Sequence, residues 1–216
     1  MSTELALYFG LFIILPGIIG VIRYKEIDKA YYPFLYLLWL GSANEILSFV
    51  LIKNGESNAT TVNVFLLIES LLICYQFFSW QLFKGFEKLF IPLIFVLALF
   101  WVLETFVLRS FKVFASYFII LHSFTNVLLS VFMINVLIAK EKKKMLKNSV
   151  FLICLGLIIF FTYAVLVEAF YLYGVSSSIE FQRAVVSVMV IINLVTNFLY
   201  TLAVIWMPKK QKFSFS

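Results

Sequence analysis

Acidic side chains interrupt the long apolar runs of this sequence. Glu45 lies inside the run YYPFLYLLWLGSANEILSFVLI, and Glu69, Glu104 and Glu168 lie inside three others. A charged side chain at the centre of a bilayer costs at least about 3 kcal/mol on insertion scales. Something must compensate such residues, which makes them candidates for binding a cation, a proton or a polar ligand.

Three neutral polar residues extend this set. His122, the only histidine, stands four residues before Asn126, so the two share one face of a helix. Asn193 begins a similar polar stripe in the last apolar run. We expect these stripes to face the interior of a helix bundle, where polar groups can satisfy one another. A neutral imidazole bonded to a neighbouring Glu or Asn is one reading of His122.

A metal site is a second reading of the same residues. The sequence contains no Glu-x-x-His or His-x-x-x-His pair within these runs, which is the spacing that usually supplies two ligands from one helix. If a metal is held, the ligands would come from separate helices: His122, Glu45, Glu69 and Glu168.

The elements that position these residues are membrane-spanning helices. Of the 216 residues, 63% are apolar and 13% are charged, and the mean hydropathy is +1.05, which excludes a soluble globular domain. Seven runs are long enough to cross a bilayer, with short polar connections between them. We therefore predict an all-α, seven-helix membrane domain over residues 1–216, with spans at 5–22, 31–52, 62–83, 89–108, 113–138, 149–174 and 185–207.

The distribution of Lys and Arg predicts the orientation. One set of alternate loops holds Arg23, Lys25, Lys29, Lys84, Lys88, Lys140, Lys142, Lys143, Lys144, Lys147, Lys209, Lys210 and Lys212, and the opposite set holds only Lys53, Arg109, Lys112 and Arg183. Because positive loops stay in the cytoplasm, the N-terminus should be outside and the C-terminus cytoplasmic. The net charge of +6 thus reflects topology and headgroup contact, and we expect the lipid bilayer, not nucleic acid, as its partner.

This orientation predicts a common depth for the polar side chains. Counting along each helix at about 1.5 Å per residue places them in one slab, roughly 6 to 14 Å below the outer surface. The members of this slab are Glu45, Glu69, Glu104, His122, Glu168 and Asn193. Since every basic residue falls in a loop, we expect no Lys or Arg to pair with the four carboxylates, which then cannot all stay ionised.

Several activities are excluded. The last run has no Lys that could carry a retinal Schiff base, so we predict no retinal and no other cofactor. No Ser-His dyad or glycine-rich phosphate loop stands out. Cys74 and Cys154 are expected to be buried free thiols, because the predicted topology sets them too far apart for a disulfide.

The chain resembles a group of uncharacterised bacterial seven-span membrane proteins of similar length. The resemblance rests on short stretches: Tyr24 to Lys29, Asn44-Glu45, Leu67-Ile68-Glu69, Ser116-Tyr117 and Asn197 to Trp206. This resemblance implies that the protein lies in the bacterial cytoplasmic membrane and that it accompanies signalling proteins. The order of the runs also looks like the carriers built from two three-helix bundles around a linker helix, with Glu45 and Glu168 at equivalent positions.

Three functions remain open. The first is a receptor-like or sensory protein that binds a small ligand or cation in an outward-facing pocket and signals to a partner at the cytoplasmic face. Its ligand-binding residues would be Glu45, Glu69, His122, Asn126, Glu168 and Asn193. The second is a small-solute or proton-coupled transporter of the 3+1+3 plan. The third is a membrane enzyme with a carboxylate and histidine or metal centre, although the short loops favour a protein that is not an enzyme.

Overall fold

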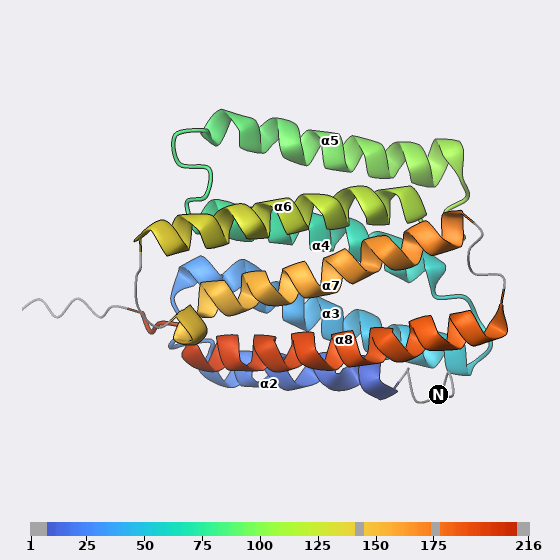
Figure 1. Ribbon diagram of the computed structural model, residues 1–216, viewed down its shortest axis with the longest axis horizontal. Helices are drawn as coiled ribbons and strands as arrows, with labels where there is room; N and C mark the ends of the chain where they lie inside the picture. The colour runs from blue at the N-terminus through green and yellow to red at the C-terminus, as the bar shows by residue number, and fades with distance from the viewer. Residues whose placement is uncertain (1–7, 141–144, 174–177, 211–216) are drawn as a thin grey trace, which may run out of the picture.

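The computed structural model describes residues 8–140, 145–173 and 178–210, and these residues are almost entirely helical (Figure 1). The N-terminal helix runs from Tyr8 to Arg23 and contains a 3₁₀ turn, Leu11–Ile13, and α2, Ile14–Arg23. The long helices are α3 (Tyr32–Lys53), α4 (Ala59–Ser79), α5 (Phe90–Val102, extended by a π-helix at Leu103–Leu108), α6 (Ser116–Lys140), α7 (Ser149–Leu172) and α8 (Ile179–Trp206). The predicted all-α fold is confirmed.

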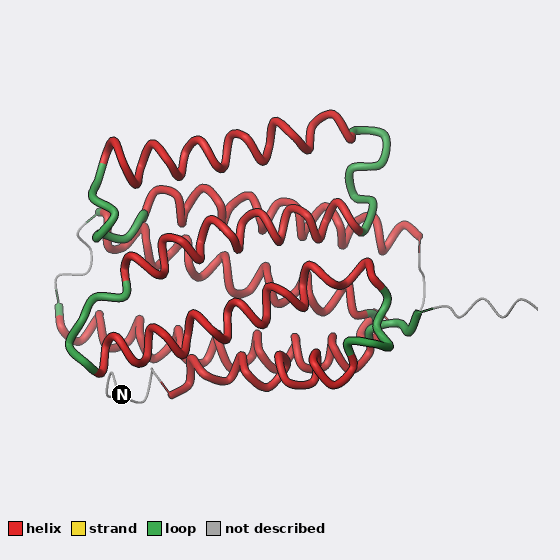
Figure 2. The backbone as a smooth tube through the Cα atoms, turned by 180° about the vertical axis from the view of Figure 1, so that it is seen from behind, coloured by secondary structure: helices red, strands yellow, loops and turns green. Residues whose placement is uncertain are grey.

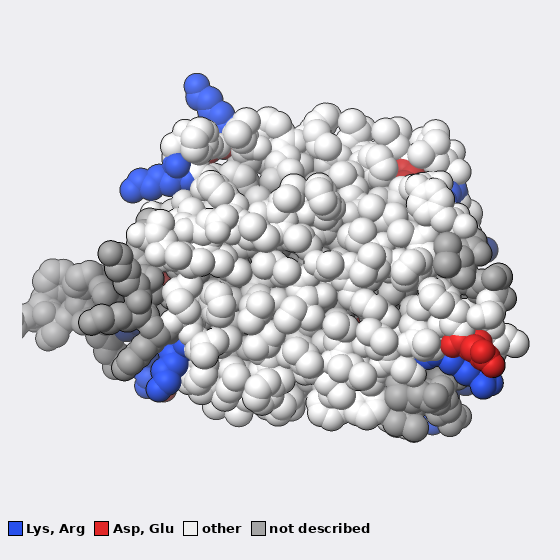
Figure 3. All heavy atoms as spheres, viewed as in Figure 1, with Lys and Arg blue, Asp and Glu red and all other residues white. Residues whose placement is uncertain are grey.

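Six helices are long and apolar enough to cross a membrane, which suggests an integral membrane protein. Large apolar side chains face outwards along them: Phe95 and Phe198 are each 63% exposed. Figure 3 shows the charged side chains at the two ends of the long axis, with an uncharged belt between them on this face. This is the pattern expected of a lipid-facing surface.

The predicted first span begins in residues outside the described part of the chain. The described portion of that helix, Tyr8–Arg23, is shorter than the other six. Seven spans and the outward N-terminus therefore stay predictions. Lys142 to Lys144 of the basic loop, Gly174 at the end of the predicted sixth span, and Lys212 also lie outside the described residues.

Polar caps set the starts of α7 and α8, and the apolar runs misplace the start of α8. α8 begins at Ile179 rather than at 185, because the Ser178 hydroxyl accepts a hydrogen bond from the backbone N–H of Phe181 at 3.1 Å. Its first turns carry the exposed residues Glu180 and Arg183, so they continue the helix beyond the apolar stretch. At α7 the prediction of residue 149 is confirmed, and Asn148 caps the helix.

The helices form a sequential ring. Each packs against the next along the chain, and α8 returns to pack against α2. α4 and α6 also pack directly on each other, which leaves α5 at the edge of the bundle (Figures 1 and 2). The main core fills the ring with residues such as Phe34, Phe77 and Ile153. A smaller core joins α4, α5 and α6 around Leu97 and Phe118.

Arg23 ties the N-terminal helix to α8 at one end of the ring. Its guanidinium donates hydrogen bonds to the backbone carbonyls of Val204, Ile205 and Met207. These carbonyls lie at the C-terminal end of α8, where the helix itself provides no donor for them. Lys209, which follows α8, forms an ion pair with Glu26 at 2.9 Å.

Both cysteines, Cys74 and Cys154, are buried and free, as predicted.

Candidate functional site

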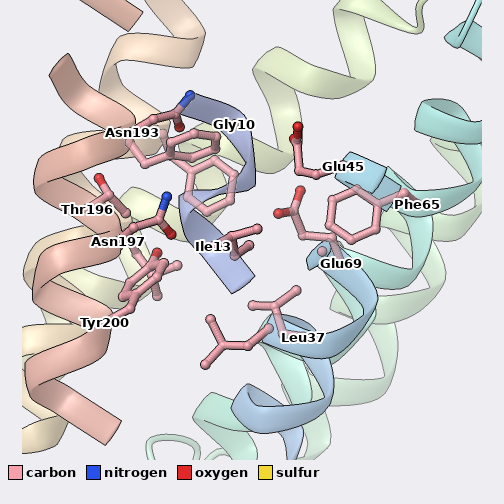
Figure 4. Close-up of a pocket in the computed structure, with 15 residues that line it drawn as sticks. Gly10, Ile13, Leu37, Glu45, Phe65, Glu69, Asn193, Thr196, Asn197 and Tyr200 are labelled. Carbon is pink, nitrogen blue, oxygen red and sulfur yellow. The ribbon is translucent and has the colours of Figure 1, made fainter. Parts of the chain in front are cut away.

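A pocket lies inside the ring, between the N-terminal helix, α3, α4, α7 and α8 (Figure 4). The room that it offers to the centres of water-sized molecules is about 90 Å³. Its polar lining consists of Glu45, Glu69, Asn193, Thr196, Asn197 and Tyr200. The rest is apolar, with the aromatic rings of Phe65, Phe160 and Phe161 among it. A mostly apolar cavity with a few convergent polar groups is the usual form of a small-molecule site.

The polar groups form two opposed faces. Glu45 on α3 and Glu69 on α4 direct their carboxyl groups into the pocket from one side (Figure 4). From the other side α8 presents Asn193, Thr196, Asn197 and Tyr200, a spacing of three and four residues that lines one helix face. When ionised, the carboxylate face can only accept hydrogen bonds, and it attracts positive charge. The amides and hydroxyls of the α8 face can both donate and accept hydrogen bonds.

Exposure falls from one end of the pocket to the other. Glu45 and Asn193 are partly exposed, while Thr196 and Tyr200 are buried. Asn193 and Tyr200 are seven residues apart, about 10 Å along α8. The pocket thus enters the bundle at the level of Glu45 and ends near the ring of Tyr200, which packs edge-on against Phe34.

Two glycines make room for these side chains. A Cβ atom at Gly10 would lie 2.6 Å from Oε2 of Glu45, and one at Gly156 would lie 2.6 Å from Cε1 of Tyr200. Real Cβ atoms essentially never come that close to another atom, so either side chain would shift if its glycine were replaced. The N-terminal helix and α7 therefore fix where the Glu45 carboxyl group and the Tyr200 ring can lie.

Glu45 and Glu69 have no Lys or Arg beside them in the pocket. Among the described residues, no Lys or Arg lines it. In the described chain, His122 lies beside Glu69, with Nε2 of the imidazole 3.4 Å from Oε2 of the carboxyl group. The buried Thr196 hydroxyl, on the opposite face, has no hydrogen-bond partner there. The pocket therefore offers acceptors for a positively charged donor.

His122 and Asn126 stand behind Glu69 and do not line the pocket. The imidazole is 1% exposed, stacks on Phe118 and meets the edge of Phe161. Its Nδ1 lies 3.0 Å from Nδ2 of Asn126. The predicted stripe on α6 is buried in the bundle, but it supports the carboxylate of Glu69 from the far side.

Glu168 belongs to a different cluster. It is absent from the lining of the pocket, and its carboxyl group lies near the Ser116 hydroxyl, Arg109 and Glu104. The depth predicted for Glu168 equals that of Glu45 and Glu69, but the side chain does not join them. α7 directs it toward the start of α6. Among the described residues, no three His, Cys, Asp or Glu side chains come together, so the proposed metal ligands His122, Glu45, Glu69 and Glu168 are not assembled as one group.

The expectation that no Lys or Arg pairs with the four carboxylates is wrong for Glu104. This fully buried residue accepts hydrogen bonds from the backbone N–H groups of Tyr117, at 3.0 Å, and Phe118, at 2.5 Å, at the start of α6. The Nε atom of Arg109 lies 3.8 Å from its carboxylate. The cause is the π-helix: the N–H of Arg109 bonds the carbonyl of Glu104 at 2.9 Å, five residues back, and this wide turn returns the guanidinium to Glu104.

Sequence reasoning overlooked part of the pocket. Thr196, Asn197 and Tyr200 follow Asn193 at helical spacing, and that periodicity could have placed them with it. Gly10, Phe65 and Phe160 carry no such signal, since they are ordinary residues of apolar runs.

No protein-family model, no curated protein and no solved structure matches this chain. The function must therefore be argued from the geometry of the pocket.

Proposed function

We propose that this protein is a receptor-like membrane protein that binds a small organic cation, a protonated amine, in the pocket between α3, α4 and α8. The ammonium group lies between the carboxylates of Glu45 and Glu69. Its apolar part contacts Phe65 and Phe161, and any polar group at its other end meets the amides and hydroxyls of α8. The predicted orientation places the pocket toward the outer face, so a signal passes to a partner at the cytoplasmic face.

The observation that carries this proposal is the pair of carboxyl groups facing a cavity with no basic side chain among its described lining. A buried charge without a partner is costly, so a ligand that brings the opposite charge gains the compensation that the protein omits. Hydrogen bonds to charged groups contribute about 1.5–3 kcal/mol each. The lining favours an amine over a bare metal ion, because most of it is apolar and because two carboxylates provide few of the oxygens that a hard cation takes.

The test uses three probes that share one apolar body and differ in charge: phenethylammonium, 2-phenylethanol and phenylacetate. Binding is measured by isothermal titration calorimetry on the purified protein in detergent micelles. We expect phenethylammonium to bind at least about tenfold more tightly than the alcohol, a difference of about 1.4 kcal/mol. Phenylacetate should bind more weakly than either probe, because its charge repels both carboxylates.

Three near-isosteric variants locate the binding. E45Q and E69Q should each weaken phenethylammonium binding about tenfold or more, since each removes one charge-assisted contact. E168Q is the matched control, because it removes a carboxyl group of similar depth outside the pocket, and it should leave binding unchanged. Equal affinity for the amine and the alcohol in the unmodified protein would refute the proposal.

A proton-coupled transporter of the same cation is the second candidate. It is favoured by the contact between Glu69 and His122 inside the spanning helices, and by the position of α5 at the edge of two three-helix sets, α2 to α4 and α6 to α8. Proteoliposomes with an imposed pH gradient should then accumulate labelled phenethylammonium, and E69Q should abolish the accumulation. If the protein binds phenethylammonium but shows no pH-driven uptake, the transporter candidate fails and the receptor proposal remains.

A further inference from the structure

A chain of three side chains leads from the pocket into α6, and the two on α6, His122 and Asn126, are buried. Glu69 lines the pocket, and its Oε2 lies 3.4 Å from Nε2 of His122. The other ring nitrogen, Nδ1, lies 3.0 Å from Nδ2 of Asn126. His122 and Asn126 are each 1% exposed, and Glu69 connects them to the pocket.

The contact with Asn126 couples the orientation of its amide to the position of the proton on the imidazole. With the amide nitrogen facing Nδ1, as in this structure, Nδ1 accepts the hydrogen bond and carries no proton, because an amide nitrogen is a donor only. A neutral imidazole then has its proton on Nε2, which faces the carboxyl group of Glu69. The separation of 3.4 Å exceeds the usual 2.7–3.2 Å of an N–H···O hydrogen bond, and Nε2 has no hydrogen-bond partner in the described chain. A small movement of the Glu69 side chain closes this contact.

The same three residues can hold one more proton. A half-turn of the Asn126 side-chain amide exchanges its nitrogen and its oxygen, so that Oδ1 faces Nδ1 and accepts a proton carried there. The second proton is then shared between Nε2 and the Glu69 carboxyl group. One proton has been added, no heavy-atom bond has formed or broken, and the net charge of the group has risen from −1 to 0.

The groups around this chain are few. In the described chain, Glu45 on α3 and Tyr200 on α8 are titratable groups that interact with Glu69, and Cys154 of α7 interacts with Tyr200. α5 contains no titratable residue, and the N-terminal helix contributes Gly10 and Ile13 to this part of the pocket. The rings of Phe118 and Phe161 cover the two other sides of the imidazole.

We propose that Glu69, His122 and Asn126 form a proton store that empties when an organic cation binds the pocket and fills when the cation leaves. A positive charge beside Glu69 favours its ionised form, so the added proton departs and Asn126 turns its nitrogen back to Nδ1. The claim that cation binding empties the store rests on the proposed function. The two protonation states of Glu69, His122 and Asn126 do not depend on it. His122 and Asn126 act as positioning residues, because they reach the ligand only through Glu69.

The single histidine makes the store directly observable. Protein labelled with ¹⁵N-histidine and held in lipid nanodiscs gives NMR signals from one imidazole only. Without a probe, Nδ1 should be unprotonated at high pH and protonated below a midpoint. Saturating phenethylammonium should move this midpoint to lower pH, and by linkage its affinity should fall about tenfold per pH unit below the midpoint, as one proton is displaced for each cation bound.

Two variants separate the store from ligand binding. E69Q should abolish the pH-dependent change at Nδ1, because residue 69 no longer titrates. E168Q should leave the change as in the unmodified protein. Persistence of the transition in E69Q, or an Nδ1 that keeps one protonation state while the folded protein is titrated, would overturn the store. If phenethylammonium fails to bind while Nδ1 responds to pH, the proposed function fails and the store stands. If phenethylammonium binds but the midpoint does not shift, the proposed function stands and the store fails.

Discussion

Replacing Gly10 by Ala tests whether the position of one carboxyl group controls binding. Gly10 has helical backbone angles, φ −57° and ψ −36°, so alanine fits its conformation. The new Cβ atom would lie 2.6 Å from Oε2 of Glu45, where ordinary van der Waals contact begins near 3.4 Å. The carboxylate must therefore move by about 0.8 Å, the difference between these two distances.

The two effects of this substitution have opposite signs. Alanine is favoured over glycine in a helix by about 1 kcal/mol, and the atom that must yield is the end of a flexible side chain, so the protein should be as stable as before or slightly more stable. A carboxylate displaced by this amount loses the geometry of a charge-assisted hydrogen bond, which contributes about 1.5–3 kcal/mol. We expect phenethylammonium to bind at least about tenfold more weakly.

The assay pairs thermal unfolding with calorimetric titration of phenethylammonium in the same detergent. G20A is the matched control, because a Cβ atom at Gly20 meets Leu35 and the Trp39 ring instead of Glu45. Unchanged binding by G10A, with G20A also unchanged, would refute the claim that the Glu45 carboxylate contacts the cation. A large loss of stability in G10A would show that Gly10 serves packing rather than the pocket.

Two further predictions concern the support of the site. E104A should destabilise the protein by about 1–3 kcal/mol, because it leaves the N–H groups of Tyr117 and Phe118 and the Arg109 guanidinium without their acceptor; denaturant unfolding should show this loss, while the exposed control E56A should stay within about 0.5 kcal/mol. G156A should force the buried Tyr200 ring from its place, since the ring offers no flexible end to yield; calorimetry should show weaker phenethylammonium binding together with a lower unfolding temperature, and wild-type values for both would contradict the assigned packing.

The sequence predicts the helices well because apolar runs of spanning length leave few alternatives. It misplaces the start of α8, since the exposed turns that Ser178 caps are polar and resemble a loop. The seventh span is not decided, because the described N-terminal helix is short.

The candidate site is only partly predictable from depth. Counting residues along each helix predicts a common depth for Glu45, Glu69 and Asn193, and all three line one pocket because they also face the ring interior. Depth does not determine the direction in which a helix turns a side chain, so Glu168 reaches Ser116 instead. Nor could it reveal the ion pair of Glu104, which depends on a π-turn that apolar periodicity does not encode.

The most direct test of the proposed cation site is the charge preference of a protein with both pocket carboxylates neutralised. Affinities for phenethylammonium and 2-phenylethanol are compared in lipid nanodiscs for the unmodified protein and for the double variant Glu45→Gln, Glu69→Gln. We predict a preference for the amine of about tenfold or more in the first and none in the second. A double variant that still prefers the amine to the same extent would contradict the assignment of these two residues as the cation site.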